Sequence, residues 1–155
     1  MEVIPDFQDL LLLLSEHQIR YLIIGGLAFI YHAKPRYTKD IDIWLDAEAE
    51  NVQQTNAALA EFGSPLQLDV NNPSEILQLG VAPNRIDLLR DVEGVSFAEA
   101  WARRIDTAYG TAPAHWIDID SLILIKSKIN EARHQDDVRV LKLVQERQQK
   151  KKQTK

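Results

Sequence analysis

Two short apolar runs near the N-terminus constrain the fold of this chain more than any other feature. The first run, residues 21–24, ends in Gly25 and Gly26, and this pattern predicts a buried strand that enters a tight turn. The second run, residues 40–45, alternates aspartate with isoleucine, which is the two-residue period of a strand. Successive side chains of a strand point to opposite faces, so its two aspartates are expected on one face and its isoleucines on the other.

Apolar spacing and turn residues predict the remaining elements, which mix helix and strand along the chain. Helices are expected over residues 6–18, 27–33, 47–62, 73–80, 96–104, 120–131 and 135–148, and further strands over residues 85–89 and 114–119. A mixed order of this kind predicts an α/β or α+β fold, in which helices flank a mixed sheet. Without an interdomain linker in the pattern, we expect a single domain over residues 1–148 and a basic, disordered tail over residues 149–155.

Composition narrows the class of function. Hydrophobic residues make up 45% of the chain and charged residues 26%, which indicates a globular rather than a disordered protein. The absence of cysteine excludes disulfide bonds and thiolate metal sites, and a net charge of -5 disfavours a broad electrostatic grip on nucleic acid. The leucine run near the N-terminus lacks the features of a signal peptide, and no apolar stretch is long enough to span a membrane. A cytoplasmic protein is therefore expected.

A third aspartate lies within an apolar run later in the chain. Asp87 stands in the middle of residues 85–89, where an unpaired carboxylate would be costly to bury. Oxygen ligands that converge from neighbouring strands suit Mg²⁺ (or Mn²⁺), so Asp40, Asp42 and Asp87 together are candidate metal ligands. The alternative interpretation is an exposed strand face, on which the aspartates form only surface salt bridges.

The two glycines add a candidate phosphate site. Because they lack a Cβ, Gly25 and Gly26 let backbone N–H groups approach an anion closely at the N-terminus of the following helix. A Gly-Gly pair alone indicates no more than a turn. A strand, two glycines, a helix and then a strand bearing Asp-x-Asp place a triphosphate cradle beside a metal site, and nucleotidyl transfer requires both.

These motifs resemble the signature of the DNA polymerase beta nucleotidyltransferase superfamily. The resemblance rests on Ile24-Gly25-Gly26, on the Asp-Ile-Asp-Ile of residues 40–43 and on Ile86-Asp87-Leu88, and it extends over about residues 20–145. The string YLIIGGLAFIYHAKPRYTKDIDIWLD is similar to small prokaryotic members related to AbiEii-type toxin nucleotidyltransferases. The resemblance implies the nucleotidyltransferase fold and a divalent metal ion, Mg²⁺ or Mn²⁺, as cofactor.

The resemblance also implies roles for individual residues. Gly25 and Gly26 would bind the nucleotide phosphates, Asp40 and Asp42 would hold the metal ions, and Asp87 would complete the metal site and take the proton of the attacking hydroxyl. Further phosphate-binding candidates are Arg36, Thr38, Lys126 and Arg133, with Asp136 as a supporting residue.

The C-terminal segment leaves one assignment open. Lys126 follows the apolar lead-in of the family motif and is preferred as the phosphate lysine, whereas Lys128 fits the family spacing to Arg133 better. The segment also departs from the family pattern, since Asp137 and Arg139 stand where an apolar residue and an aspartate are usual. The four histidines show no metal-ligand spacing, and we expect none of them to be catalytic: His17, His32, His115 and His134.

The resemblance implies an enzyme that moves a nucleoside monophosphate from an NTP to a hydroxyl acceptor. Similarity to toxin-type relatives implies a tRNA 3′ end or a protein side chain as acceptor, in the toxin of a toxin–antitoxin pair. Aminoglycoside-type acceptors are less expected, because a chain of this length has no evident second domain to hold them. The alternative is an antitoxin-like partner of the same fold that binds or nucleotidylates a cognate toxin, although the intact set of aspartates argues against an inert version.

Overall fold

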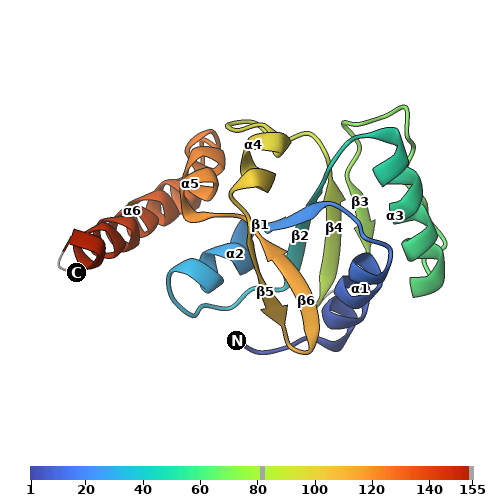
Figure 1. The fold of residues 1–155 in the computed structure, drawn as a ribbon, viewed down its shortest axis with the longest axis horizontal. Coiled ribbons are helices and arrows are strands. Elements are labelled where there is room, and N and C mark those ends of the chain that lie inside the picture. Colours follow the sequence, from blue (N-terminus) through green and yellow to red (C-terminus); the bar gives the residue numbers. More distant parts are fainter. Residues whose placement is uncertain (81–82, 154–155) are drawn as a thin grey trace.

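The computed structural model describes residues 1–80 and 83–153 and shows a six-stranded sheet with helices on both faces (Figure 1). The strands lie in the spatial order β3-β4-β2-β1-β6-β5. Their bounds are β1 (Tyr21–Ile24), β2 (Asp40–Leu45), β3 (Leu77–Leu79), β4 (Arg85–Leu89), β5 (Ile105–Tyr109) and β6 (Ala112–Trp116). The β2–β4 and β1–β6 pairs are parallel and the other pairs are antiparallel. The mixed sheet predicted from the sequence is therefore confirmed.

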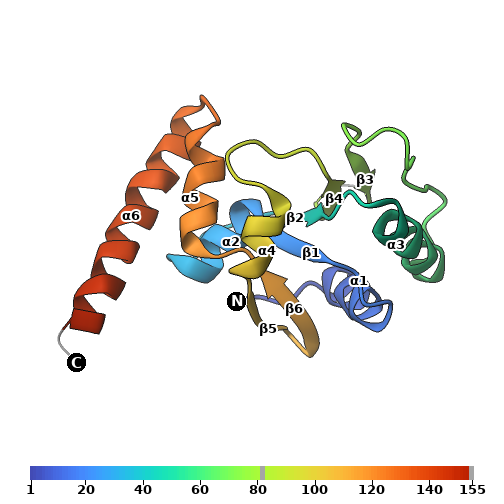
Figure 2. The same ribbon diagram turned by 45° about the horizontal axis from the view of Figure 1, so that its top comes forward.

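The helices form one layer on each face of the sheet. They are α1 (Pro5–Glu16), α2 (Gly25–His32), α3 (Ala49–Phe62), α4 (Phe97–Ala102), α5 (Ile119–Ser127) and α6 (Ala132–Gln153). Helices α1 and α3 cover one face, whereas α2, α4, α5 and α6 lie on the other (Figure 2). Helix α6 is the outermost element of its layer, and its C-terminal end projects away from the sheet (Figure 1).

Alternate strand positions divide their side chains between two apolar cores, as the pleat of a strand requires. Ile41 and Ile43 of β2 belong to the core beneath α1 and α3. Trp44 belongs to the core on the other face, with side chains of α2, α5 and α6. Asp40 and Asp42 occupy the same alternate positions as Trp44. Both aspartates therefore face the layer formed by α2, α5 and α6.

Two elements differ from the prediction made from the sequence. A helix was predicted over residues 73–80, but residues 77–79 form β3, because Leu77 and Leu79 pair with Leu88 and Ile86 of β4. Strand β5 was not predicted. It is an edge strand that pairs only with β6, and its three central side chains are exposed, so its sequence lacks the apolar alternation of a buried strand.

The C-terminal end of the chain is helical as far as it is described. A disordered tail was predicted over residues 149–155, whereas α6 continues to Gln153, and residues 154 and 155 lie outside the described residues. None of the helices in the described part of the chain is both long enough and apolar enough to cross a membrane.

Candidate active site

The three predicted carboxylates lie on two adjacent parallel strands. Strand β4 pairs with β2 so that Asp87 stands directly beside Asp42, and Arg85 stands beside Asp40. Because paired residues of neighbouring strands point to the same face, Asp40, Asp42 and Asp87 share the face covered by α2, α5 and α6. Ile86 and Leu88, which flank Asp87, belong to the opposite core.

Arg85 joins two of these carboxylates, a contact that the sequence analysis did not anticipate. Its Nε donates to Oδ1 of Asp87 over 2.9 Å, and its Nη2 donates to Oδ2 of both Asp87 and Asp40 over 3.2 and 3.3 Å. Arg85 precedes Asp87 by two residues, so the strand period places both side chains on one face. The guanidinium therefore neutralises part of the negative charge that the aspartates bring together.

Asp42 is the most perturbed carboxyl group of the set. Burial raises its pKa to about 6, and the negative charges of Asp87 and Asp40 and a hydrogen bond with Asp87 act in the same direction, against the smaller effect of the Lys126 ammonium. Such a carboxyl group is poorly solvated and surrounded by like charge. A cation that approached it would relieve both the repulsion and the desolvation.

The two glycines allow helix α2 to begin directly against these carboxylates. Gly25 has a φ of +70°, and a Cβ at this position would lie 2.1 Å from Oδ2 of Asp42. Glycine is favoured there, because the positive φ would strain another residue and a Cβ would displace the Asp42 carboxylate. A Cβ on Gly26 would lie 3.2 Å from Oγ1 of Thr38, so the segment before β2 also packs closely on this turn.

All the residues predicted to bind the nucleotide phosphates, and two of the three predicted metal ligands, line a single cavity of about 420 Å³, which we name the polar cavity; Asp87 is not part of its lining. The predicted residues that line it are Gly25, Gly26, Arg36, Thr38, Asp40, Asp42, Lys126 and Arg133. Tyr37, Lys39 and His134 line it as well, and the sequence analysis did not assign them a role. The N-terminus of α2 and several cationic side chains thus border the same space as two carboxylates.

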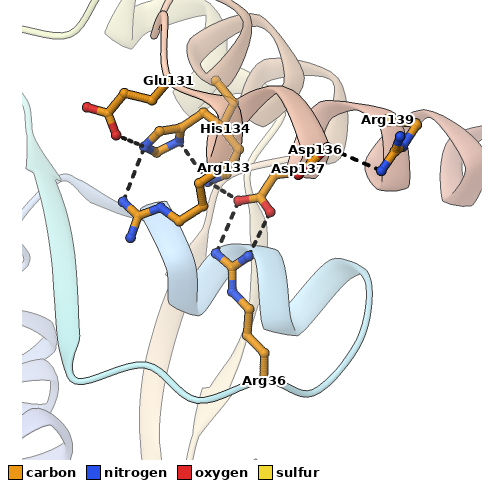
Figure 3. A network of polar contacts seen from close by, with 8 residues as sticks. Arg36, Glu131, Arg133, His134, Asp136, Asp137 and Arg139 are labelled. Atoms are coloured by element: carbon orange, nitrogen blue, oxygen red, sulfur yellow. Dashed lines mark hydrogen bonds and ion pairs between the residues drawn. The ribbon is translucent and has the colours of Figure 1, made fainter.

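Helix α6 joins this cavity through a buried aspartate. Asp137 accepts two hydrogen bonds from the Arg36 guanidinium, over 2.7 and 3.1 Å, and one from Nζ of Lys126 over 2.9 Å. The Lys126 side chain is only 2% exposed and that of Asp137 only 5%. Arg36 also stacks over the ring of Phe29, 4.2 Å from its centre. Figure 3 shows Arg36 reaching up to Asp137 from the segment that follows α2.

These contacts set the charge of each partner. Burial lowers the pKa of Lys126, whereas Asp137 acts in the opposite direction. Burial acts to raise the pKa of Asp137, but the hydrogen bonds from Arg36 and Lys126 outweigh it and hold that pKa below its ordinary value. Asp137 therefore holds two cations of the polar cavity in fixed positions.

The neighbouring residues of α6 occupy different surroundings. Asp136, predicted as the supporting aspartate, is exposed and accepts a hydrogen bond from Arg139 over 3.2 Å (Figure 3). His134 lies between Lys126 and Arg133, with a ring nitrogen 3.4 Å from a nitrogen of each. Burial and these two cations lower the pKa of His134, so its ring is a neutral member of the cavity wall. Lys128 is exposed and does not line the polar cavity.

The sequence of the segment that carries the glycines and aspartates of this site matches a known family. The model of the aminoglycoside-2''-adenylyltransferase family matches residues 6–91, which is more than half of the chain and includes both glycines and all three aspartates. The chain belongs to the aminoglycoside-2''-adenylyltransferase family. It is therefore a nucleotidyltransferase enzyme, as predicted from the sequence. A comparison with curated proteins gave no match.

Solved structures share the fold of this member of the aminoglycoside-2''-adenylyltransferase family. The lincosamide antibiotic adenylyltransferase LnuA, with lincomycin bound, matches with a TM-score of 0.62 and 18% identity over 90% of this chain and 96% of that chain. ANT(2'')-Ia in complex with adenylyl-2''-tobramycin matches with a TM-score of 0.55 and 14% identity, over 87% and 84% of the two chains. A nucleotidyltransferase-like protein from Paracoccidioides brasiliensis matches with a TM-score of 0.52 and 12% identity, over 90% and 74%.

These likenesses show the nucleotidyltransferase fold, and the family match over residues 6–91 supports the predicted nucleotidyltransferase superfamily. The AbiEii-type branch within it stays a prediction. Within residues 1–80 and 83–153, no three acidic, histidine or cysteine side chains are already placed around one point as metal ligands. The donor set nevertheless fits a divalent cation, because three carboxylates share one face and the pKa of Asp42 is raised partly by their repulsion.

Proposed function

We propose that this nucleotidyltransferase moves a nucleoside monophosphate from an NTP to a hydroxyl group of a small antibiotic-like acceptor and releases pyrophosphate. The observation that supports this most strongly is the polar cavity, in which Gly25 and Gly26 lie beside Asp40 and Asp42 and face the buried Lys126. Such a cavity combines backbone donors and cations for phosphate with carboxylates for a metal ion. Consumption of an NTP also agrees with the cytoplasmic location expected from the sequence.

In this proposal the triphosphate lies in the polar cavity. The α2 N-terminus, with Gly25 and Gly26, contacts the phosphates through backbone N–H groups, and Thr38 lies next to it. Lys126, Arg36 and Arg133 face the leaving pyrophosphate, whose negative charge grows in the transition state. Asp137 keeps the first two of these cations oriented, so that no reorganisation is needed during the reaction.

The carboxylates act where the acceptor hydroxyl attacks the α-phosphorus. Asp40, Asp42 and Asp87 would hold Mg²⁺ (or Mn²⁺), and the ion would supply positive charge that stabilises the reacting phosphate. The acceptor oxygen forms a bond to the α-phosphorus while the bond to the pyrophosphate oxygen breaks. The hydroxyl proton passes to a carboxylate oxygen, for which Asp87 is the proposed base. Arg85 must release its hydrogen bonds to Asp40 and Asp87 before these oxygens can act.

The nature of the acceptor is inferred from the relatives. The matching family is named for an aminoglycoside adenylyltransferase, and two similar structures are antibiotic adenylyltransferases. The argument from chain length against a small-molecule acceptor fails, since this chain covers 96% of LnuA, whose structure has lincomycin bound. These relatives favour an antibiotic-like acceptor over the tRNA 3′ end, the protein side chain and the toxin–antitoxin role implied by the resemblance to AbiEii-type proteins.

The test offers the purified protein each acceptor class in a separate reaction. Each NTP, labelled at its α-phosphate, is incubated with the protein, Mg²⁺ and either lincomycin, an aminoglycoside panel, total RNA or total cell protein. We expect label on a small molecule with the wild type and none with Asp42→Asn. Label on RNA or protein would contradict the proposed acceptor, and no transfer to any acceptor from any NTP would contradict the proposed function.

A further inference from the structure

A second cavity, of about 340 Å³, borders the polar cavity along a shared wall. The shared wall consists of Gly25, Asp42, Lys126 and His134. Away from that wall, the second cavity is enclosed by the segment that follows β4 and by α5. A molecule in this cavity would therefore reach Asp42 from outside the proposed triphosphate site.

The walls of this second cavity, which we name the apolar cavity, differ from those of its neighbour. Leu89 at the end of β4 and Val92 in the segment after it line this cavity on one side. Leu122 and Ile125 of α5, and Ile129 just after that helix, line it on the other. Branched aliphatic side chains offer contact area but few hydrogen bonds. A volume of this size accepts a small organic molecule, and such walls select one with an apolar flank.

The rim of the apolar cavity carries two exposed carboxylates and one exposed lysine, Lys128. Asp91 and Glu93 line it and are exposed, and no ion pair involves either of them within residues 1–80 and 83–153. Gly94 fixes this rim on α5, because its φ is +113° and a Cβ there would lie 2.7 Å from the carbonyl oxygen of Leu124. The segment after β4 thus packs on α5 through the backbone of Gly94, and the carboxylates of Asp91 and Glu93 lie beside the aliphatic side chains of the cavity.

We propose that the apolar cavity binds the acceptor and selects an amphiphilic amine that carries a hydroxyl group. Its apolar flank contacts the aliphatic side chains of α5, and its protonated amine faces Asp91 and Glu93. Its hydroxyl points across the shared wall toward Asp42, where the α-phosphate of the nucleotide is attacked. The acceptor is thus distinct from a polycationic sugar, which would leave the aliphatic wall without a partner. The direction assigned to the hydroxyl rests on the proposed function, whereas binding of the amine in the apolar cavity does not depend on it.

The test measures binding by isothermal titration calorimetry on the full chain without NTP, at pH 7 and low ionic strength. The probes are lincomycin, an amine with an apolar flank, and tobramycin, a polycationic aminoglycoside. We expect lincomycin to bind the wild type more tightly than tobramycin. The double variant Asp91→Asn with Glu93→Gln should weaken lincomycin binding about fivefold or more, because it removes two exposed charges from the rim.

Two further variants separate this effect from general changes. Ile129→Trp fills the cavity and should weaken lincomycin binding by at least about tenfold. Asp9→Asn with Glu16→Gln removes the same charge from exposed positions of α1, on the other face of the sheet, and should leave binding unchanged. ATP affinity, titrated separately, should change by less than about twofold in all of these variants.

Several results would overturn the proposal. Absence of lincomycin binding to the wild type, tighter binding of tobramycin, or equal losses in the rim variant and its α1 control would each do so. A loss of ATP affinity in Ile129→Trp with unchanged lincomycin binding would assign the cavity to the nucleobase instead. Rim-dependent lincomycin binding without any nucleotidyl transfer would contradict the proposed function and leave the assignment of the cavity intact.

Discussion

Replacement of Asp137 by asparagine removes the buried carboxylate of α6 that holds two cations of the polar cavity, Arg36 and Lys126. The wild-type carboxylate accepts hydrogen bonds from Arg36 and Lys126, and the Lys126 side chain is almost fully buried. Asparagine has a similar shape but no charge. The Lys126 ammonium would then lose its hydrogen-bonded counter-charge in the interior, and Arg36 would lose its bidentate partner.

The expected cost follows from this burial. Removal of one partner from a buried ion pair costs about 3–5 kcal/mol, because the remaining charge is desolvated and unpaired. Arg36 is partly exposed and can be solvated, so most of the cost arises at Lys126. In a domain of this size the loss corresponds to a fall in the melting temperature of roughly 10 °C.

The adjacent Asp136→Asn is a matched control. It removes the same charge one position earlier in the same helix, where Asp136 and its partner Arg139 are both well exposed. Its effect should be under about 0.5 kcal/mol. The free energy of unfolding of both variants and the wild type is measured by urea denaturation at pH 7, with tryptophan fluorescence as the signal.

The difference between Asp137→Asn and the wild type should also depend on pH. Arg36 and Lys126 hold the pKa of Asp137 below 3.8, so its contribution is fully present above that pH and is lost as the pH falls through the lower pKa of the folded protein. Equal stability losses in the Asp136 and Asp137 variants at pH 7 would refute the assignment of Asp137 as the buried anchor.

Three other perturbations have defined outcomes. In metal-free protein, Asp42→Asn should be about 2–3 kcal/mol more stable than the wild type above pH 6 and equally stable below pH 3.8. The reason is that the raised pKa of Asp42 makes the wild type lose stability as the pH rises through about 6. Urea denaturation across this pH range measures the difference. Lys126→Ala should lower kcat/KM for the NTP about tenfold or more, whereas Lys128→Ala should leave it nearly unchanged; the reverse order in steady-state kinetics would restore Lys128 as the phosphate lysine. Arg85→Gln should tighten Mn²⁺ binding about threefold or more, because the guanidinium no longer competes for Asp40 and Asp87. Direct titration with Mn²⁺ measures this affinity, and weaker binding by the variant would show that Arg85 assists metal binding instead.

The strands that carry the carboxylates were predictable because the residues that alternate in the sequence also alternate between the two faces of the sheet. In β2 the isoleucines enter one core and the aspartates face the other side, so a period of two identified both the strand and the orientation. Strand β4 behaves in the same way around Asp87. Gly25 was predictable for a related reason, since its positive φ and its close approach to Asp42 both favour a residue without a side chain.

Contacts between distant segments were not predictable in the same way. Asp137 meets Lys126 only because α5 and α6 pack side by side, and it meets Arg36 across 101 positions of sequence. Apolar spacing along one helix carries no such information. Residues 73–80 contain a helix-start signal at Pro73, yet pairing of Leu77 and Leu79 with β4 overrides that local preference.

The metal site and the triphosphate site are tested together by a crystal structure with Mn²⁺ and a non-hydrolysable ATP analogue, in which the anomalous signal locates the metal. We predict a Mn²⁺ position within about 2.2 Å of oxygens of Asp40 and Asp42, with Asp87 completing the site. The phosphates should lie against Gly25 and Gly26 and face Lys126, and the Arg85 guanidinium should have left the carboxylates. Phosphates outside the polar cavity, or a metal bound without these aspartates, would contradict the account.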